Sequence, residues 1–306
     1  MPLPEFVTRS TIDPSKQPKS PSILPEKRWG KLHNSIYVAG IDEAGRGPLA
    51  GPVVASAVVF NLSGKPPKGI NDSKKLTHEQ RVLLAEQIKN ASVAWGVGRA
   101  EPWEIDEINI LQATKLAAVR AIEQANTMLA AVVGLHAAID CLVTDALDLP
   151  AYPCPQLMLI KGDQRSTSVA AASILAKVTR DEIMCRFADQ YPNYGWRINK
   201  GYPTPEHRRA LLELGPSSWH RFSYKTVSAC TLPVVRSAAF QRLFALGSNL
   251  QVEEKERFQG VINELERCRM DIPQEDFNHL RLLLGNVFSE IVKKNTNFSL
   301  ESAANP

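Results

Sequence analysis

Short runs of apolar and β-branched residues alternate with polar segments in the first part of the chain. Three such runs cover residues 35–41, 53–60 and 92–98. Runs of this length and composition are typical of β-strands. The pattern therefore predicts three strands of an antiparallel meander.

Helical periodicity lies between and after these strands. Thr77 and Gln80 have the spacing of a capping box, and Val82, Leu83 and Ile88 supply an apolar stripe behind it. A second, longer helix is predicted over residues 103–129. Its stripe comprises Ile105, Ile108, Leu116, Val119 and Ile122.

The next region alternates strands with helices. Residues 138–147 and 156–163 have compact apolar strand patterns, and residues 166–191 have a helical pattern with a face of small side chains. Strands that alternate with helices after a meander are typical of an α/β domain with a mixed sheet.

The two ends of the chain differ from this centre. Residues 1–34 are rich in Pro, Ser and Lys without a sustained period, which predicts a flexible N-terminal arm. Residues 226–306 contain amphipathic helical segments without strand patterns, which predicts a helical C-terminal extension. One α/β domain is therefore expected over residues 35–225.

Composition narrows the class of protein. The 306 residues are 44% hydrophobic and 22% charged, which suits a globular protein with a sizeable core. The five cysteines include no C-x-x-C pair, so neither a disulfide framework nor a thiolate zinc site is indicated, and a reducing, cytoplasmic location is expected. We recognise no secretory segment and no membrane span. The formal net charge of +4 permits a polyanionic partner without establishing one.

The first candidate chemistry lies in the stretch GIDEAGRGPLAGP, residues 40–52. Gly45, Gly47 and Ala50 match the G-x-G-x-x-A spacing of a dinucleotide-binding loop. Such a loop passes from a strand into a helix, whose N-terminus holds the pyrophosphate. Here prolines and a second strand pattern follow, so the context predicts a strand, a turn and another strand instead.

Two adjacent acids in the same stretch suggest a metal site. Successive strand residues point to opposite faces, so Asp42 and Glu43 can serve one site only if the strand ends or bulges there. Asp145 and Asp163 each follow a further apolar strand pattern. Carboxylates at several strand ends are typical of a divalent-cation site, and all-oxygen ligands favour Mg²⁺ or Mn²⁺. Two such ions make a phosphodiester cleavage site.

Six sequence blocks, in order, carry a resemblance to a known family. They are GIDEAGRGPLAGPVVASAVV, INDSKKLT, EIDEINILQAT, LVTDAL, KGDQRSTSVAAASILAKVTRD and YPNYGWRINKGYPTPEH. Their order over residues 35–224 resembles that of ribonuclease HII, the type 2 ribonuclease H. The resemblance implies an α/β, ribonuclease H-like fold, a mixed five-stranded sheet flanked by helices, with the helical C-terminal extension as an appendage.

The resemblance also implies an activity. It identifies Asp42, Glu43, Asp145 and Asp163 as the catalytic, metal-binding carboxylates of an endonuclease that uses Mg²⁺ or Mn²⁺. The implied substrates are the RNA strand of RNA/DNA hybrids and single ribonucleotides in duplex DNA, cut on their 5′ side to leave 3′-hydroxyl and 5′-phosphate ends. Ribonucleotide excision repair and removal of RNA primers during replication are the implied roles. We expect a cytoplasmic monomer without membrane contact.

Substrate recognition is implied at two further places. Gly45, Arg46 and Gly47 match the family motif that reads the ribose 2′-hydroxyl, a task suited to backbone without bulky side chains. Tyr202 matches the tyrosine that packs on the neighbouring deoxyribose and favours an RNA-to-DNA junction. A half-buried core tyrosine is the alternative.

Positively charged side chains are candidates for contacts with substrate phosphates, which position a nucleic acid without reading its sequence. These candidates are Arg46, Lys74, Lys177 and Arg180. Lys177 lies four residues before Asp181 on a predicted helix, so the two side chains can instead form an ion pair. His207 is a further candidate, with a structural role at a helix start as its alternative.

Two positions depart from the family pattern. Ala146 follows Asp145 where Gly is common, and Asn199 stands where many members have His. Neither departure removes a proposed metal ligand, but the substrate contacts near Tyr202 stay open.

Other functions also stay open. One is a non-catalytic protein that binds hybrids, and another is a different two-metal nuclease or recombinase of the same architecture. The C-terminal helices are expected to pack as a structural unit. A clasp on the duplex, a lid and a partner-binding segment are the alternatives for them.

Overall fold

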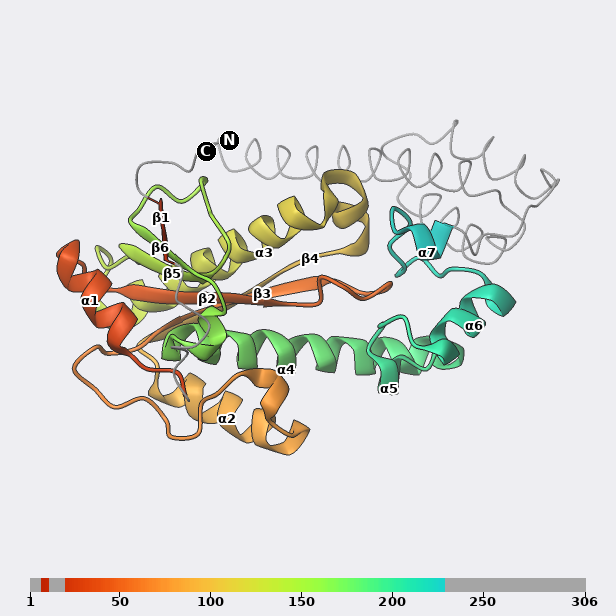
Figure 1. Ribbon diagram of the computed structural model, residues 1–306, viewed down its shortest axis with the longest axis horizontal. Coiled ribbons are helices and arrows are strands. Elements are labelled where there is room, and N and C mark those ends of the chain that lie inside the picture. The colour runs from red at the N-terminus through yellow and green to blue at the C-terminus, as the bar shows by residue number, and fades with distance from the viewer. Residues whose placement is uncertain (1–6, 11–19, 229–306) are drawn as a thin grey trace, which may run out of the picture. The chain divides into compact units, whose positions relative to one another are not determined.

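A computed structural model describes residues 7–10 and 20–228 of the chain (Figure 1). The chain divides into two compact units, with the boundary between Tyr202 and Pro203. This boundary falls before the predicted end of the α/β domain at residue 225. The predicted helical extension lies outside the described residues from position 229 onward.

A mixed six-stranded sheet forms the first unit, in the order β1-β6-β5-β2-β3-β4. Strands β2, β3 and β4 pair antiparallel, as the meander pattern predicted, whereas β2, β5, β6 and β1 pair in parallel. Strands β2 to β6 confirm the predicted five-stranded sheet, and β1 adds a sixth strand. The strands are β1 (Val7–Ser10), β2 (Val38–Ala44), β3 (Val53–Val59), β4 (Ala94–Ala100), β5 (Cys141–Asp145) and β6 (Gln156–Leu159).

Helices cover both faces of this sheet, with α3 on one face and α2 and α4 on the other (Figure 1). The helices of the first unit are α1 (Leu24–Leu32), α2 (His78–Ala91), α3 (Pro102–Val133), α4 (Thr167–Gln190) and α5 (Trp196–Asn199). Its 3-10 turns are η2 (Ser73–Lys75), η3 (Gly162–Gln164) and η4 (Pro192–Tyr194). In the second unit, the described helices are α6 (Pro205–Leu214) and α7 (Lys225–Ser228).

Helix α3 approaches the sheet closely because small residues line both surfaces. A Cβ added at Gly96 or Gly98 of β4 would lie 2.1 Å from the carbonyl oxygen of Ala121 or Ala117, respectively. Both alanines are fully buried. The predicted stripe is therefore only partly correct: Ile105 and Ile122 are buried, whereas the other three members are only partly buried, and alanines fill much of the buried face.

By length and composition alone, α3 could cross a membrane, although no span was expected from the sequence. The core helix of a globular domain meets the same criteria. Its buried alanine face packs against β3 and β4.

The predicted stripe of α2 is only partly correct. Its capping box is confirmed, since Gln80 N donates to Thr77 Oγ1 and Thr77 N donates to Gln80 Oε1. Ile88 is buried as predicted, whereas Val82 and Leu83 are exposed. The buried positions of the first turns are instead Leu84 and Ala85. Consecutive apolar residues leave the phase of a helix ambiguous, and packing against α4 decides it.

Part of the predicted flexible arm has regular structure. Residues 24–32 form α1, whose Trp29 joins an apolar cluster with Val38. Glu26 is fully buried, and its Oε1 accepts hydrogen bonds from Ser166 Oγ at 2.7 Å and Ser168 N at 2.8 Å. The prediction is therefore wrong for α1 and β1, because tertiary contacts order segments whose local sequence shows no period.

We expect Gly98→Ala to lower the free energy of unfolding by about 2 kcal/mol, because the added methyl group would overlap the backbone of α3. Gly64→Ala is the control, since the nearest atom to its added Cβ is Asn61 O at 3.3 Å. Urea denaturation would measure both changes. A Gly98→Ala protein as stable as the control would contradict this close packing.

Candidate active site

Four acidic side chains lie at neighbouring strand ends in the first unit. Asp42 and Glu43 are near the end of β2, Asp145 is the last residue of β5, and Asp163 lies in η3, after β6. The parallel pairing of β2 with β5 ends at Ile41, whereas the antiparallel pairing with β3 continues past both acids. Strand β2 therefore ends before the two acids, as predicted, only in its pairing with β5.

Backbone amides hold two of these carboxylates. Asp42 Oδ1 accepts a hydrogen bond from Glu43 N at 2.7 Å, and Asp145 Oδ1 accepts one from Gly162 N at 2.8 Å. The second bond ties the end of β5 to the turn that carries Asp163. Glu43 Oε2 is buried and has no hydrogen-bond partner among the described residues.

The pKa of each of the four carboxyls is raised. Burial is the main cause in every case, because it disfavours the ionised form. Repulsion adds to it: Glu43 and Asp145 raise the pKa of Asp42, and Asp145 raises that of Glu43. The pKa of Asp163 rises to about 6. The four groups therefore destabilise one another when all are ionised.

Two cations lie beside the carboxylates and partly offset this repulsion. Arg46 Nη1 is 3.3 Å from Glu43 Oε1, and Lys74 Nζ is 3.8 Å from Asp163 Oδ2. The Lys74 side chain is largely exposed and that of Arg46 about half exposed, so each can also reach a ligand in solvent.

Asp72, which the sequence patterns did not single out, shapes the loop that carries Lys74. It is buried, its Oδ1 accepts from Lys74 N at 3.0 Å, and its Oδ2 accepts from Gln164 Nε2 at 3.3 Å. It is thus bonded to both η2 and η3. The signal was an Asn-Asp-Ser stretch before a short helical turn, where Asp commonly caps the backbone.

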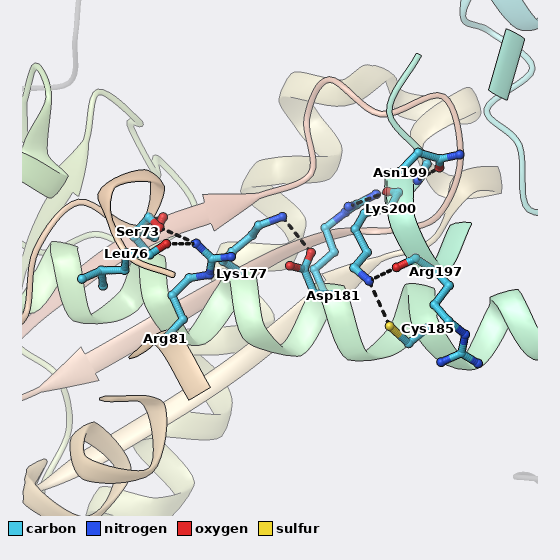
Figure 2. Close-up of polar contacts among 12 residues, drawn as sticks. Ser73, Leu76, Arg81, Lys177, Asp181, Cys185, Arg197, Asn199 and Lys200 are labelled. Atoms are coloured by element: carbon cyan, nitrogen blue, oxygen red, sulfur yellow. Dashed lines mark hydrogen bonds and ion pairs between the residues drawn. The ribbon is translucent and has the colours of Figure 1, made fainter. Parts of the chain in front are cut away.

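Arg81 of α2 supports the same loop (Figure 2). Its Nη1 donates to Ser73 O at 2.8 Å and to Leu76 O at 2.6 Å. The Ser73 hydroxyl lies 2.9 Å from that of Ser173 on α4. Contacts with two helices therefore position Lys74, although its own side chain extends into solvent.

The chemical type of the donor atoms at this site suits a divalent cation. Carboxylate oxygens are the ligands that Mg²⁺ and Mn²⁺ prefer, and the buried Glu43 Oε2 is an unsatisfied acceptor among them. Among residues 7–10 and 20–228, no three Asp, Glu, His or Cys side chains are gathered closely enough to hold an ion together. The carboxylates thus influence one another's pKa although no three of them form a common cluster in the described part of the chain.

The glycine loop, residues 45–52 between β2 and β3, lies beside Tyr202. The position of an added Cβ at Gly47 is 3.9 Å from Tyr202 Cε1. Gly45 has φ +95°, and a Cβ there would lie 2.1 Å from Arg180 Nε. Tyr202 is 40% exposed, so its ring is available to a ligand.

The side chains predicted to contact phosphates differ in their exposure to solvent. Arg180 is fully buried, so that prediction is wrong for it. Lys177 Nζ lies 2.7 Å from Asp181 Oδ1, which confirms the alternative of an ion pair (Figure 2). In the second unit, His207 is fully buried with its Nε2 3.0 Å from His220 Nε2, which confirms the structural alternative.

A mixed sheet with acids at adjacent strand ends, beside a glycine loop and exposed cations, defines a nuclease of the ribonuclease H-like class. A family model described as Ribonuclease HII matches residues 39–227. The chain therefore belongs to the ribonuclease HII family. It is an endoribonuclease, and the activity of this family is directed at the RNA of RNA/DNA hybrids and depends on metal ions.

Relatives and solved structures agree with this assignment. Ribonuclease HII of Desulfitobacterium hafniense is 48% identical over 206 residues, which cover 67% of this chain and 75% of the relative. That of Zymomonas mobilis is 48% identical over 190 residues, 62% of this chain and 85% of the relative.

Two solved structures share the fold. Ribonuclease H2 from Pyrococcus horikoshii OT3 has a TM-score of 0.53 at 26% identity, covering 63% of this chain and 96% of its own. Bst-RNase HIII in complex with Mn²⁺ has a TM-score of 0.52 at 18% identity, covering 66% of this chain and 71% of its own, and this likeness shows the fold alone.

We expect Ala146→Gly to raise the free energy of unfolding by up to about 1 kcal/mol. Ala146 has φ +52°, in the left-handed region where Gly is unstrained and Ala is not. Urea denaturation would measure the gain. Ala138→Gly, at an exposed position without positive φ, is the control and should lower stability. A loss of stability in both variants would contradict the strain at Ala146.

The raised pKa of Asp163 predicts a pH-dependent effect on stability. The folded value of about 6 lies above the ordinary 3.8, so the folded state keeps this proton to higher pH than the unfolded state. Its contribution to stability is full below pH ~4 and is lost as pH rises through ~6. Asp163→Asn should therefore stabilise the metal-free protein by roughly 2 kcal/mol at pH ~8 and little at pH ~4.

Urea denaturation in the presence of a chelator would measure this difference. Glu182→Gln, at an exposed position on α4, is the control and should change stability little at either pH. An equal gain from Asp163→Asn at both pH values would contradict the electrostatic explanation.

Proposed function

We propose that this protein is a two-metal endonuclease that cuts the RNA strand of RNA/DNA hybrids and also cuts on the 5′ side of single ribonucleotides in duplex DNA. The observation that carries the proposal is the placement of Asp42, Glu43, Asp145 and Asp163 at adjacent strand ends, near enough for Asp145 to raise the pKa of the other three. The products would carry 3′-hydroxyl and 5′-phosphate ends.

The four carboxylates would hold Mg²⁺ or Mn²⁺, which supply an activated water and stabilise the leaving 3′-oxygen. The side chains of this site favour such ions, because a cation relieves the repulsion that raises their pKa. Arg46 and Lys74, each extended into solvent, would bind phosphates on either side of the cut.

The glycine loop would supply selectivity for RNA. Gly47 presents exposed backbone without a side chain, so a ribose 2′-hydroxyl can approach it closely, whereas Gly45 lets the loop pack against Arg180. Tyr202, beside Gly47, would pack on the sugar of the next nucleotide and favour a junction from RNA to DNA. Selectivity would then depend on the distance between the loop and the ring.

These properties would suit ribonucleotide excision repair and the removal of RNA primers. We further propose that the protein acts as a monomer in the cytoplasm, without membrane contact. The support for these proposals is the substrate class and the composition of the chain.

We expect the wild-type protein to cut a labelled DNA duplex with one ribonucleotide on its 5′ side when Mg²⁺ or Mn²⁺ is present, and not with a chelator. Asp42→Asn should lower the rate at least about a hundredfold, because it removes one charge that orients the ions. Tyr202→Ala should lower it about tenfold through the loss of packing on the sugar. Glu182→Gln is the matched control and should keep the wild-type rate.

Two results would favour the other functions. Equal cleavage of an all-deoxynucleotide duplex would indicate a nuclease indifferent to the 2′-hydroxyl. Tight binding of a hybrid by folded protein, without cleavage under any metal condition, would indicate a binding protein.

A further inference from the structure

Arg180 lies in the middle of α4, and its guanidinium group is buried inside the protein. It is 0% exposed. Its Nε donates to Pro52 O, its Nη1 to Lys200 O and its Nη2 to Ala50 O, each at 3.0 Å. Burial of a charge is unfavourable unless hydrogen bonds compensate it, and these three bonds to carbonyl oxygens provide such compensation.

The three carbonyl groups belong to two segments that are far apart in the sequence. Ala50 and Pro52 lie at the end of the glycine loop, before β3, and Lys200 lies two residues before Tyr202. One planar guanidinium group therefore connects both segments. A direct hydrogen bond from Leu49 N to Gly201 O, 2.8 Å long, joins them as well.

The backbone of both segments is shaped to fit against Arg180 and its neighbours on α4. A Cβ at Gly45 would overlap the Arg180 side chain, and one at Gly51 would lie 2.2 Å from Met184 Sδ. A Cβ at Gly201 would lie 2.6 Å from Ala50 O. The contact therefore leaves little freedom for the two segments to slide past each other.

Tyr202 is held by the same group of residues. Arg180 Cζ and Lys177 Nζ each lie 5.8 Å from the centre of its ring, within the range of cation–π attraction. Asp181 in turn holds Lys177 (Figure 2). Gly201 N donates to Asn199 Oδ1 at 2.8 Å, so Asn199 also shapes the turn before the ring.

We propose that Arg180 is a positioning residue that sets the distance between the glycine loop and Tyr202, and thereby the preference for an RNA-to-DNA junction over a uniform hybrid. This inference rests on the proposed function. Lysine cannot replace arginine here, because a single ammonium nitrogen cannot reach three carbonyl groups arranged around a planar fork.

The test compares kcat/KM for two substrates: a DNA duplex with one ribonucleotide and a uniform RNA/DNA hybrid. Arg180→Lys should lower the ratio of the first value to the second by about tenfold, mainly through kcat, since the lost alignment matters at the transition state. Arg186→Lys, at an exposed position on the same helix, is the matched control and should leave the ratio unchanged. Thermal unfolding with and without Mn²⁺ would report the fold and the metal site of each variant.

Arg180→Gln is the second variant, because its amide keeps two donors without the charge and should also lower the ratio. An equal fall of both kcat/KM values, or no fall, in folded variants would overturn the role in positioning. Loss of cooperative unfolding in both variants would show that Arg180 is needed for folding itself, and this result would also overturn the role in positioning. A wild-type protein that cuts neither substrate would instead refute the proposed function, and this inference with it.

Discussion

The close approach of α4 to the sheet is the contact on which the site depends. A Cβ at Gly40 of β2 would lie 2.2 Å from the Ser168 carbonyl carbon, so the start of α4 rests directly on the strand two residues before Asp42. Asp163 lies just before this helix, in a turn that is bonded to the end of β5 through Gly162 N and Asp145 Oδ1. Further along α4, Arg180 holds the glycine loop. One helix therefore positions both the carboxylates and the segments expected to recognise substrate.

Electrostatic repulsion limits how such a site can be built. Four buried or partly buried acids raise one another's pKa, and the protein offsets part of this cost with Arg46 and Lys74. Because neither cation is buried, both can release the carboxylates when a divalent ion and a phosphate arrive. The repulsion that lowers stability without a bound cation is thus the same repulsion that favours cation binding.

Much of the architecture could be predicted from local patterns. The strands, the α2 capping box and the positions of the acids after apolar runs all depend on short-range spacing, which the sequence displays directly. The family resemblance rested on six motifs in a fixed order, and these can be recognised without knowing how the chain packs. The faces of α2 and α3 were harder to predict, because consecutive apolar residues and an alanine-rich face do not specify one phase.

The sequence by itself determined the fold class, the family and the placement of the four acids at or after strand ends, since these depend on residue types and their order. Only the tertiary structure decided that Arg180 is buried, that Asp72 supports the Lys74 loop and that α1 is ordered by Glu26 and Trp29. It also decided that Ala146 takes a left-handed conformation. Each of these depends on contacts between segments distant in the sequence, and the energy of burial and hydrogen bonding at such contacts is not visible in local spacing.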